Sequence, residues 1–442
     1  MLSFMGRVAG VAAAALLAGA VSGCSTASMP ASASPSWRVG VVLPLSGMPA
    51  ELANQERQGI QLAADLVNSD GGVQGRQVVL DVRDLSDSSQ AATVVDQFKA
   101  EDASVVLGSY ASDLSMVVSS AASTAGLVYW ESGAVADQLT GRGLPLVFRV
   151  GADGARLGAN SVTFAATQLA PMLGKTPATL RVTIVAATDA YARSVADAAQ
   201  AGIGRSGALL ADRINYELSV PDWPSVLRQL VASQPDVVIL AAHIPDGEAF
   251  RRAMIAANIH VGALIGSTMA QCVGDFGEEL GPDAVGVFAS DRPTGGFNPG
   301  ALNSDARSLY DRFAAEWSKS NGSTQPTEEG LAAFTAAWAL FHDVVPHAAG
   351  LDAASIASAA RAVDLPEGSL PNGSGLRFSA DPSRLGQNEL AAAVVWQWQA
   401  AKPAGSGTAS SSVAVATPLS VTVWPPQFAS GPIDPALVPL PR

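Results

Sequence analysis

From residue 37 onward, short runs of apolar residues alternate with segments whose hydrophobic residues recur at a helical period. The predicted strands are residues 38–45, 78–84, 105–108, 127–130, 147–150, 182–187, 214–218, 237–242, 263–266 and 285–289. The predicted helices between them include residues 51–68, 90–99, 113–125, 155–169, 192–202 and 246–257. Continuously apolar strands that alternate with helices are typical of parallel sheets covered on both faces. Ten such strands are too many for one doubly wound sheet, so the pattern predicts an α/β fold of two lobes.

The part of the chain beyond residue 300 has a different pattern. Three further helices are predicted there, at residues 304–319, 328–345 and 353–363. Two strands follow, at residues 390–399 and 419–424, and we interpret them as an antiparallel pair. The final residues, 429–442, are rich in proline and are expected to be extended or disordered.

The charge of the chain excludes one class of partner. Its formal net charge is −13, and charged residues make up only 15% of the sequence. No run of basic residues occurs, and phosphate binding needs clustered Lys and Arg. We therefore expect no nucleic-acid partner.

The N-terminus has the pattern of an export signal. Arg7 precedes an apolar stretch at residues 8–21, which is too short to span a bilayer but suits the core of a signal peptide. The stretch ends in Val21-Ser22-Gly23-Cys24, which resembles the bacterial lipobox, where the cysteine thiol receives a diacylglycerol. The alternative is an ordinary secretory signal with a chance cysteine.

These features predict a chain held outside the cytoplasm by a lipid anchor on Cys24. The signal peptide would be residues 1–23, and residues 24–36 would form a flexible tether. The other cysteine, Cys272, is expected to be buried and inert. Two cysteines exclude a disulfide framework and a cysteine-based zinc cluster.

Three stretches near the start of the first lobe carry a family resemblance. They read RVGVVLPLSG at residues 38–47, GIQLAADLVN at 59–68 and GGVQGR at 71–76. With the order and spacing of later strand ends, the chain resembles the branched-chain amino acid binding family of ABC-transporter substrate-binding proteins. The resemblance implies the type I periplasmic binding fold, with two doubly wound parallel-sheet lobes joined by three hinge crossovers. The implied lobes are residues 37–150 with 285–365, and residues 151–284 with 366–428.

Candidate ligand residues follow from the expected sheets, because ligands of open α/β sheets bind at the carboxyl ends of the strands. Ser112 follows a strand and opens a helix, where a hydroxyl and backbone N–H groups favour an anionic oxygen. The resemblance implies the same role, while the alternative is a helix N-cap. Gly133, Ala134 and Val135 match the ligand-holding turn of the family, with Val135 where a threonine is usual. The turn is expected to offer its backbone groups to the ligand.

The second lobe is expected to supply Tyr191, which matches the aromatic residue that packs over the ligand in the family; the alternative is a surface aromatic at a helix start. The family carboxylate that pairs with a ligand ammonium is replaced here by Thr268. A buried ammonium needs a counter-charge. Glu131 is the preferred substitute and Asp246 the second, although Glu131 could equally be a solvated carboxylate at the rim.

Two further positions complete the expected site. Leu52 stands where the family has a first-lobe aromatic residue, and His243 lies at a second-lobe strand end. His243 could hydrogen-bond a ligand, although a lone histidine is more often structural.

No catalytic or cofactor motif is convincing. Residues 202–207 fit G-x-G-x-x-G but follow a helix instead of opening one, so the dinucleotide mechanism is unsupported. His342 and His347 are five residues apart, which fails the i, i+4 geometry of a helical metal pair. We expect no cofactor, no metal and no enzymatic activity.

The sequence therefore predicts a lipid-anchored receptor that binds a small polar ligand (an amino acid, an amide or a small carboxylate) for an ABC permease and its ATPase. A receptor that senses the ligand without transport is the alternative. A hydrolase is the weakest option.

Overall fold

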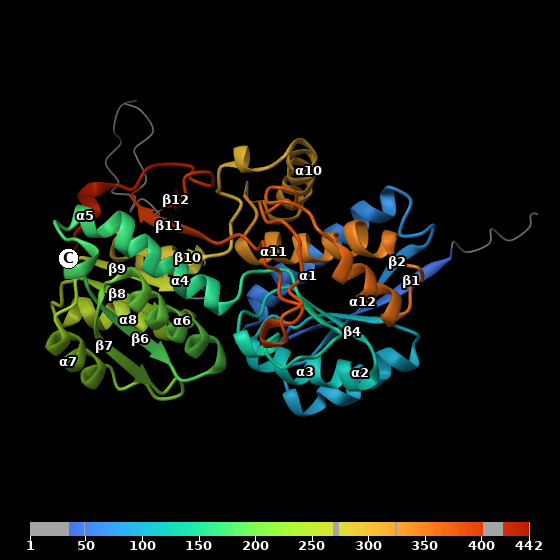
Figure 1. Cartoon of the computed structure of the whole chain (residues 1–442), viewed down its shortest axis with the longest axis horizontal. Helices are drawn as coiled ribbons and strands as arrows, with labels where there is room; N and C mark the ends of the chain where they lie inside the picture. Colours follow the sequence, from blue (N-terminus) through green and yellow to red (C-terminus); the bar gives the residue numbers. More distant parts are fainter. Residues whose placement is uncertain (1–34, 48, 268–273, 323–324, 401–418, 442) are drawn as a thin grey trace, which may run out of the picture. The chain divides into compact units, whose positions relative to one another are not determined.

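The strands form two separate sheets, each with helices packed against its faces (Figure 1). This computed structural model describes residues 35–47, 49–267, 274–322, 325–400 and 419–441. The predicted two-lobed α/β fold is thus confirmed. Every predicted strand overlaps an observed one.

The first sheet has five parallel strands in the order β2-β1-β3-β4-β5. They are β1 (Ser36–Leu43), β2 (Gln77–Asp84), β3 (Val105–Gly108), β4 (Val128–Glu131) and β5 (Val147–Arg149). The helices within this stretch are α1 (Ala50–Ser69), α2 (Ala91–Ala100) and α3 (Ser112–Ala125). β3 and β4 are buried along their whole length, as expected for central strands covered on both faces.

The second sheet has seven strands in the order β12-β11-β10-β9-β8-β6-β7. They are β6 (Arg181–Ala187), β7 (Leu209–Tyr216), β8 (Val237–Ala241), β9 (Ala263–Ser267), β10 (Phe288–Asp291), β11 (Val394–Gln399) and β12 (Leu419–Trp424). Its helices include α4 (Gly154–Phe164), α6 (Ala190–Ser206), α7 (Trp223–Ser233), α8 (Ile244–Ala256) and α9 (Gly274–Leu280). β11 is antiparallel to β10 and to β12, which confirms the predicted antiparallel pair.

The chain crosses between the lobes three times, but one crossing lies later than expected. Residues 285–365 were expected in the first lobe. β10 instead pairs with β9 and β11 in the second sheet, because its buried strand continues the parallel order of β8 and β9. The crossing to the first lobe follows β10, and the next helices are α10 (Ser304–Asn321), α11 (Glu328–Trp338) and α12 (Ala353–Ala362).

The chain before β11 also departs from the expected boundary at residue 366. Phe378 packs its ring against Trp130 and Phe148 of the first sheet, at centroid distances of 5.3 and 5.1 Å. The Asn388 side chain donates to the Val150 carbonyl at 2.9 Å. Residues 376–388 therefore lie against the first lobe, and the chain returns to the second sheet only at β11.

Residues 429–442 were expected to be extended or disordered, and the described part, residues 429–441, excludes the second alternative because it packs on the second lobe. The Leu440 N–H donates to the Gly262 carbonyl beside β9, and Arg251 of α8 donates to the Pro441 carbonyl at 3.2 Å. Val438 and Leu440 are buried. The C-terminal segment packs because its leucine and valine side chains contact apolar surface of the second lobe. The proline content of the segment did not indicate this packing.

α11 occupies an unusual position, because every one of its residues is buried. It packs along α1, and Gly330 meets Trp317 of α10 so closely that a Cβ atom there would clash with the indole ring. A helix that is apolar all round is expected in an interior. The buried position of α11 carries Glu328 and Glu329, at its first turn, into the protein.

Candidate functional site: a cavity between the two lobes

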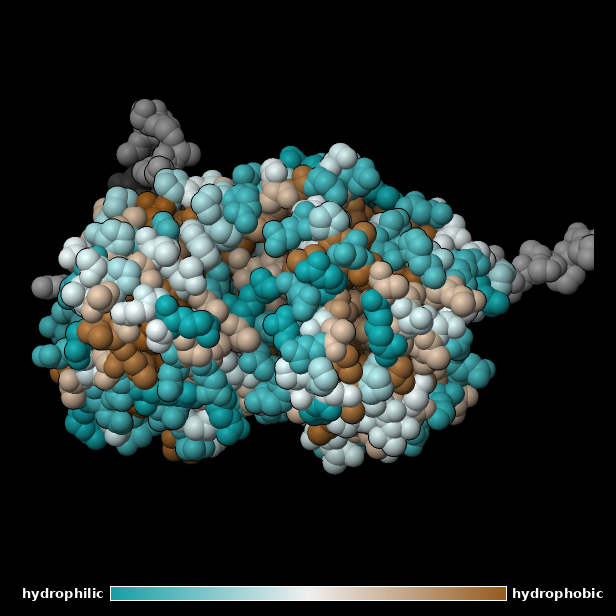
Figure 2. All heavy atoms as spheres, viewed as in Figure 1, coloured by the Kyte–Doolittle hydropathy of each residue, from teal (hydrophilic) through white to brown (hydrophobic). Residues whose placement is uncertain are grey.

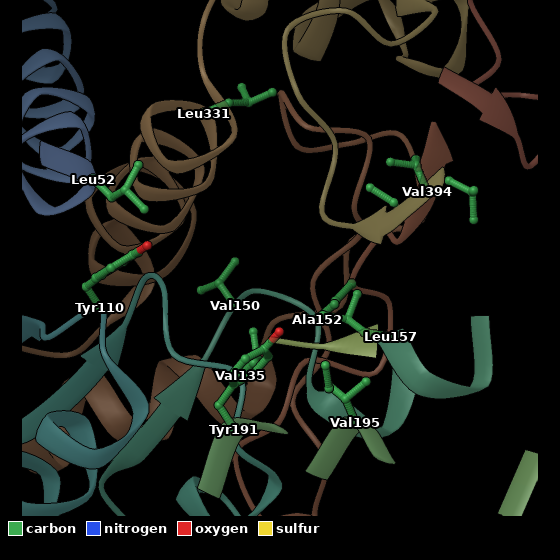
Figure 3. Packing of buried hydrophobic residues seen from close by; sticks show 14 of the residues in the cluster. Leu52, Tyr110, Val135, Val150, Ala152, Leu157, Tyr191, Val195, Leu331 and Val394 are labelled. Carbon is green, nitrogen blue, oxygen red and sulfur yellow. The ribbon is translucent and has the colours of Figure 1, made fainter. Parts of the chain in front are cut away.

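A cavity of about 100 Å³ lies where strand ends of both sheets meet. The first lobe lines it with residues 110–113 after β3 and 133–135 after β4. The second lobe contributes Asp189, Tyr191 and His243. Arg292, Glu328 and Glu329 complete the lining. Figure 3 shows Tyr110 and Val135 on loops of the first lobe, with Tyr191 reaching the same region from the second lobe.

The first-lobe wall is a loop at residues 131–137 whose backbone is held by buried side chains. The Glu131 carboxylate accepts hydrogen bonds from the N–H groups of Gly133 and Ala134, both at 2.8 Å. It also accepts the Tyr129 hydroxyl at 2.7 Å. Glu131 is fully buried and does not line the cavity, so its carboxylate shapes the wall instead.

Two buried arginines hold the carbonyl groups of the same loop. Arg292 donates to the Ser132 and Gly133 carbonyls at 3.2 and 2.8 Å. Arg149 donates to the Ala134 and Ala136 carbonyls at 3.2 and 2.7 Å. The Gly133 and Ala134 backbone groups, which were expected to face a ligand, are therefore already hydrogen-bonded to Glu131 and to the two arginines.

Ser112 is the first residue of α3, and its neighbour Ala111 is the N-cap. The Ser112 hydroxyl accepts a hydrogen bond from the Ala136 N–H at 3.2 Å, which links the two first-lobe loops. It does not cap its own helix. The first N–H groups of α3 have no carbonyl partner within the helix, so this end of the cavity favours an anionic or acceptor group.

Tyr110 precedes this helix in a left-handed backbone conformation, with φ of 69°. A residue with a bulky side chain rarely adopts this conformation without tertiary support. Tyr110 is only 5% exposed, and no described residue hydrogen-bonds its hydroxyl. Burial, followed by the charge of Glu329, raises the pKa of the Tyr110 hydroxyl well above its usual value, so the group stays protonated.

The second-lobe wall is built from rings. The Tyr191 and His243 rings meet edge to face with centroids 5.2 Å apart. The Tyr191 hydroxyl donates to the Ala242 carbonyl at 3.2 Å and also lies against the Ser267 carbonyl. The His243 Nε2 atom lies 3.8 Å from an Asp189 carboxylate oxygen. Tyr191 thus presents its ring to the cavity while its hydroxyl is bound to its own lobe.

A buried network of charges lies behind the cavity. Arg292 pairs with Glu328, and its Nε atom is 3.7 Å from Asp291. Burial alone would lower the pKa of Arg292, but the surrounding carboxylates raise it. Glu56 of α1 is fully buried and accepts the Ser132 hydroxyl at 2.7 Å. Burial raises the pKa of Glu56 to about 8, against the opposing charge of Arg292.

The structure brings together six of the nine predicted ligand residues, because Ser112, Gly133, Ala134, Val135, Tyr191 and His243 all line the cavity. Glu131 and Leu52 do not line it: Glu131 binds its own loop, and Leu52 is buried in the core. The second substitute, Asp246, accepts hydrogen bonds from the Tyr216 hydroxyl and the His243 N–H. Thr268, Cys24 and Cys272 lie outside the described residues.

Sequence reasoning missed the polar residues Tyr110, Arg292, Glu328 and Glu329. One signal was present, because Glu328 and Glu329 open a predicted helix whose remaining residues are almost all apolar. Such a helix must be buried along with its first turn. Glu56 also gave a signal, since it stands four residues from both Leu52 and Ile60 on the apolar stripe of α1.

A wider hollow of about 690 Å³ lies on the second lobe alone, lined by Leu218, Trp223 and Pro245 among others. Figure 2 shows apolar surface between the positions that α7 and α8 have in Figure 1, where residues of these two helices line a further hollow of the second lobe. No described residue of the first lobe lines the wider hollow. Of the cavity and the wider hollow, only the smaller cavity uses both lobes.

Two searches of the described residues bear on other functions. None of the helices described is both long and apolar enough to cross a membrane. No group of three or more His, Cys, Asp or Glu side chains in the described segments could hold a metal ion.

Two α/β lobes that share a ligand-sized cavity at their strand ends define a solute-binding protein. The sequence profile of the family described as "Periplasmic binding protein" matches residues 36–400. The chain belongs to this family, which places it outside the cytoplasm. The family consists of solute-binding proteins and not of enzymes.

Individual relatives agree with this assignment. The "Leu/Ile/Val-binding protein homolog 8" of Brucella abortus (strain 2308) is 28% identical over 367 residues, covering 83% of this chain and 89% of the relative. A substrate-binding protein of an ABC transporter from Desulfitobacterium hafniense, solved in complex with Leu, aligns with a TM-score of 0.66 at 21% identity. That match covers 82% of this chain and 98% of the other.

A solute-binding protein from R. palustris, solved in complex with benzoate, aligns with a TM-score of 0.63 at 19% identity, covering 82% and 93% of the two chains. These structural matches support the fold.

Proposed function

We propose that this chain is the receptor of an ABC importer and binds a small amino acid or a small carboxylate between its lobes. The supporting observation is the cavity itself, because strand ends of both sheets line it and neither lobe encloses it alone. A ligand bound there would contact both lobes and stabilise their closed arrangement through its greater affinity for that state.

Contacts at the rim of the cavity support a closing motion of this kind. The Ser194 hydroxyl on α6 accepts the Asp137 N–H at 3.0 Å and donates to the Gln138 side chain at 3.1 Å. Asp137 and Gln138 begin the short helical turn, Asp137–Leu139, that directly follows the first-lobe loop of the cavity wall. The two lobes therefore touch through a few hydrogen bonds, which a ligand can reinforce.

The ligand class is supported by the names of relatives. One relative is named for leucine, isoleucine and valine, and the two solved structures compared above hold Leu and benzoate. All of these ligands carry a carboxylate. The N-terminus of α3, with the Ser112 hydroxyl, is suited to receive that group.

The lipid anchor on Cys24 is part of this proposal, because the lipobox-like sequence at residues 21–24 follows an export signal. Mass spectrometry of the membrane fraction tests it. The native chain should begin at a diacylated Cys24, whereas Cys24→Ser should yield no lipidated form. An unmodified cysteine in the mature native protein would exclude the anchor.

The central experiment is a thermal-shift screen over amino acids, amides and small carboxylates, followed by calorimetry. A ligand at a hundredfold excess over its Kd stabilises the native state by about 2.7 kcal/mol, which is readily detected. Uptake of the ligand by cells that lack the gene should fall if the chain serves an importer. Unchanged uptake with intact binding would favour a sensing receptor, and no ligand from any class would contradict solute binding at this cavity.

A further inference from the structure

The cavity lining carries more acidic than basic groups. Asp113, Asp189, Glu328 and Glu329 line it, and Arg292 is its only lining lysine or arginine among the described residues. Carboxylates in a confined site repel one another and lose hydration, so the site stabilises a cation that enters it.

Arg292 alone does not balance these charges, because its single positive charge is shared among Glu56, Asp291, Glu328 and Glu329. It pairs with Glu328, lies close to Asp291 and donates two hydrogen bonds to the loop at Ser132 and Gly133. Glu329 forms no ion pair with any described residue. Glu329 is therefore a lining carboxyl group that forms no ion pair within the described chain, although Arg292 attracts it from a longer distance.

Tyr110 provides an independent indication of a ligand at the same place. Tyr110 lines the cavity, and its buried hydroxyl has no hydrogen-bond partner among the described residues. Glu329 lines the same cavity as Tyr110, and its charge is the largest influence on the pKa of this hydroxyl after burial. A buried hydroxyl without a partner is costly unless a ligand supplies one.

The ionisation of Glu329 would respond to a cation bound in the cavity. Burial, together with repulsion by Glu328, raises the pKa of Glu329 well above its usual value. A cation bound beside it would stabilise the ionised form.

We propose, on the basis of the proposed function, that Glu329 and the Tyr110 hydroxyl form a first-lobe site for a protonated amino group of the ligand. The ammonium would donate to the Glu329 carboxylate and to the Tyr110 oxygen, while the α3 N-terminus receives the acceptor end of the ligand. The counter-charge would thus come from α11 of the first lobe and not from the strand ends of the second lobe. The ligands of this chain are then amine-bearing molecules, and simple carboxylates are excluded.

Three matched series of probes test the ligand class on the full chain. The amino acids are leucine, valine and phenylalanine. Their analogues without the amino group are 4-methylpentanoate, 3-methylbutanoate and 3-phenylpropanoate. Their analogues without the carboxylate are 3-methylbutylamine, 2-methylpropylamine and 2-phenylethylamine. The tightest amino acid should bind at least tenfold more tightly than its deaminated analogue.

Glu329→Gln tests the residue, because the glutamine keeps the size of the side chain and removes its charge. The variant should lose at least tenfold in affinity for the amine-bearing probe and change little for the deaminated one. Glu51→Gln is the matched control, since Glu51 is also an acidic residue in the first turn of a helix, but is exposed. Tyr110→Phe should weaken the same probe by a smaller factor.

The outcomes separate this inference from the function on which it rests. Tighter binding of a deaminated acid, or unchanged affinity of Glu329→Gln for an amine, overturns the amino-group site and leaves solute binding intact. Failure of all three series to bind, together with failure of every ligand in the wider thermal-shift screen, overturns both. Circular dichroism of Glu329→Gln checks that the variant folds. If it does not fold, the affinities of Tyr110→Phe and the order of affinities among the probes for the native chain test the amino-group site.

Discussion

The two walls of the cavity are built by different means. On the first-lobe side, Glu131, Arg149 and Arg292 are all buried and bind the backbone of one loop through charge-assisted hydrogen bonds. On the second-lobe side, the rings of Tyr191 and His243 form the surface. The nearest carboxylates lie 3.8 and 3.9 Å from the His243 nitrogens, beyond ordinary hydrogen-bond distance.

The difference indicates separate tasks for the two lobes. A loop whose donors and acceptors are bound internally keeps its shape without a ligand, so the first wall is preorganised. An aromatic surface contributes apolar area over a broad range of positions and suits a lobe that closes over a bound ligand. The free energy of unfolding should therefore depend mainly on the first wall. The second wall should affect the closure of the lobes over a ligand more than it affects folding.

The largest expected effect is on the first wall. Arg292→Met should lower the free energy of unfolding by about 3–5 kcal/mol, because it leaves Glu328 and Asp291 buried without their cation. Urea unfolding measures this change. Arg312→Met is the control, since Arg312 pairs with Asp70 at 3.1 Å but is 45% exposed, and should cost less than about 1 kcal/mol. Equal losses in both variants would show that the charge network does not hold this wall.

The second prediction concerns pH. The pKa of Glu56 is raised from 4.5 to about 8, so its protonated form stabilises the folded chain, and this contribution is lost as pH rises through that range. Relative to Glu56→Gln, the native protein should lose about 1 kcal/mol of unfolding free energy per pH unit between pH 5 and 8. Urea unfolding at several pH values provides the comparison. The exposed Glu51→Gln on the same helix should follow the native pH dependence; identical slopes in native protein and Glu56→Gln would contradict the assignment.

The third prediction concerns ligand affinity and the first-wall residue Ser112, where a smaller effect is expected. Ser112→Ala should weaken binding of the best probe by about 1–3 kcal/mol, because both the ligand and the Ala136 N–H lose a hydroxyl partner. Calorimetry measures this loss. Ser120→Ala, on an exposed position of α3, should bind as the native chain does. Full affinity in Ser112→Ala would remove Ser112 from the binding site.

The smallest effect is expected on the second wall. Tyr191→Phe keeps the ring and removes the hydroxyl that bonds to the Ala242 and Ser267 carbonyls, so unfolding should become easier by about 1 kcal/mol. Ligand affinity should change by less than about threefold, because the ring remains. A much larger loss of affinity, measured by calorimetry, would show that the hydroxyl contacts the ligand and that the second wall is not a purely apolar surface.

Sequence reasoning located the cavity, but the carboxylate that it preferred as the partner of a ligand ammonium, Glu131, does not line it. Ser112, Tyr191 and His243 could be predicted because the carboxyl ends of parallel strands meet at one edge, whatever the side chains there. Glu131 also follows a strand, but its oxygens are taken by N–H groups two and three residues further along. Whether a carboxylate faces a ligand or its own loop depends on backbone conformation, which strand position does not reveal.

The sequence by itself determined the secondary structure and the two-lobed plan, because hydrophobic periodicity acts over neighbouring residues and needs no knowledge of distant contacts. Only the tertiary structure decided that β10 joins the second sheet, that the C-terminal segment packs beside β9, and that Glu329 of α11 reaches the loops after β3 and β4. These outcomes depend on burial and charge shared between segments far apart in the chain, and such energies exist only once the segments have come together.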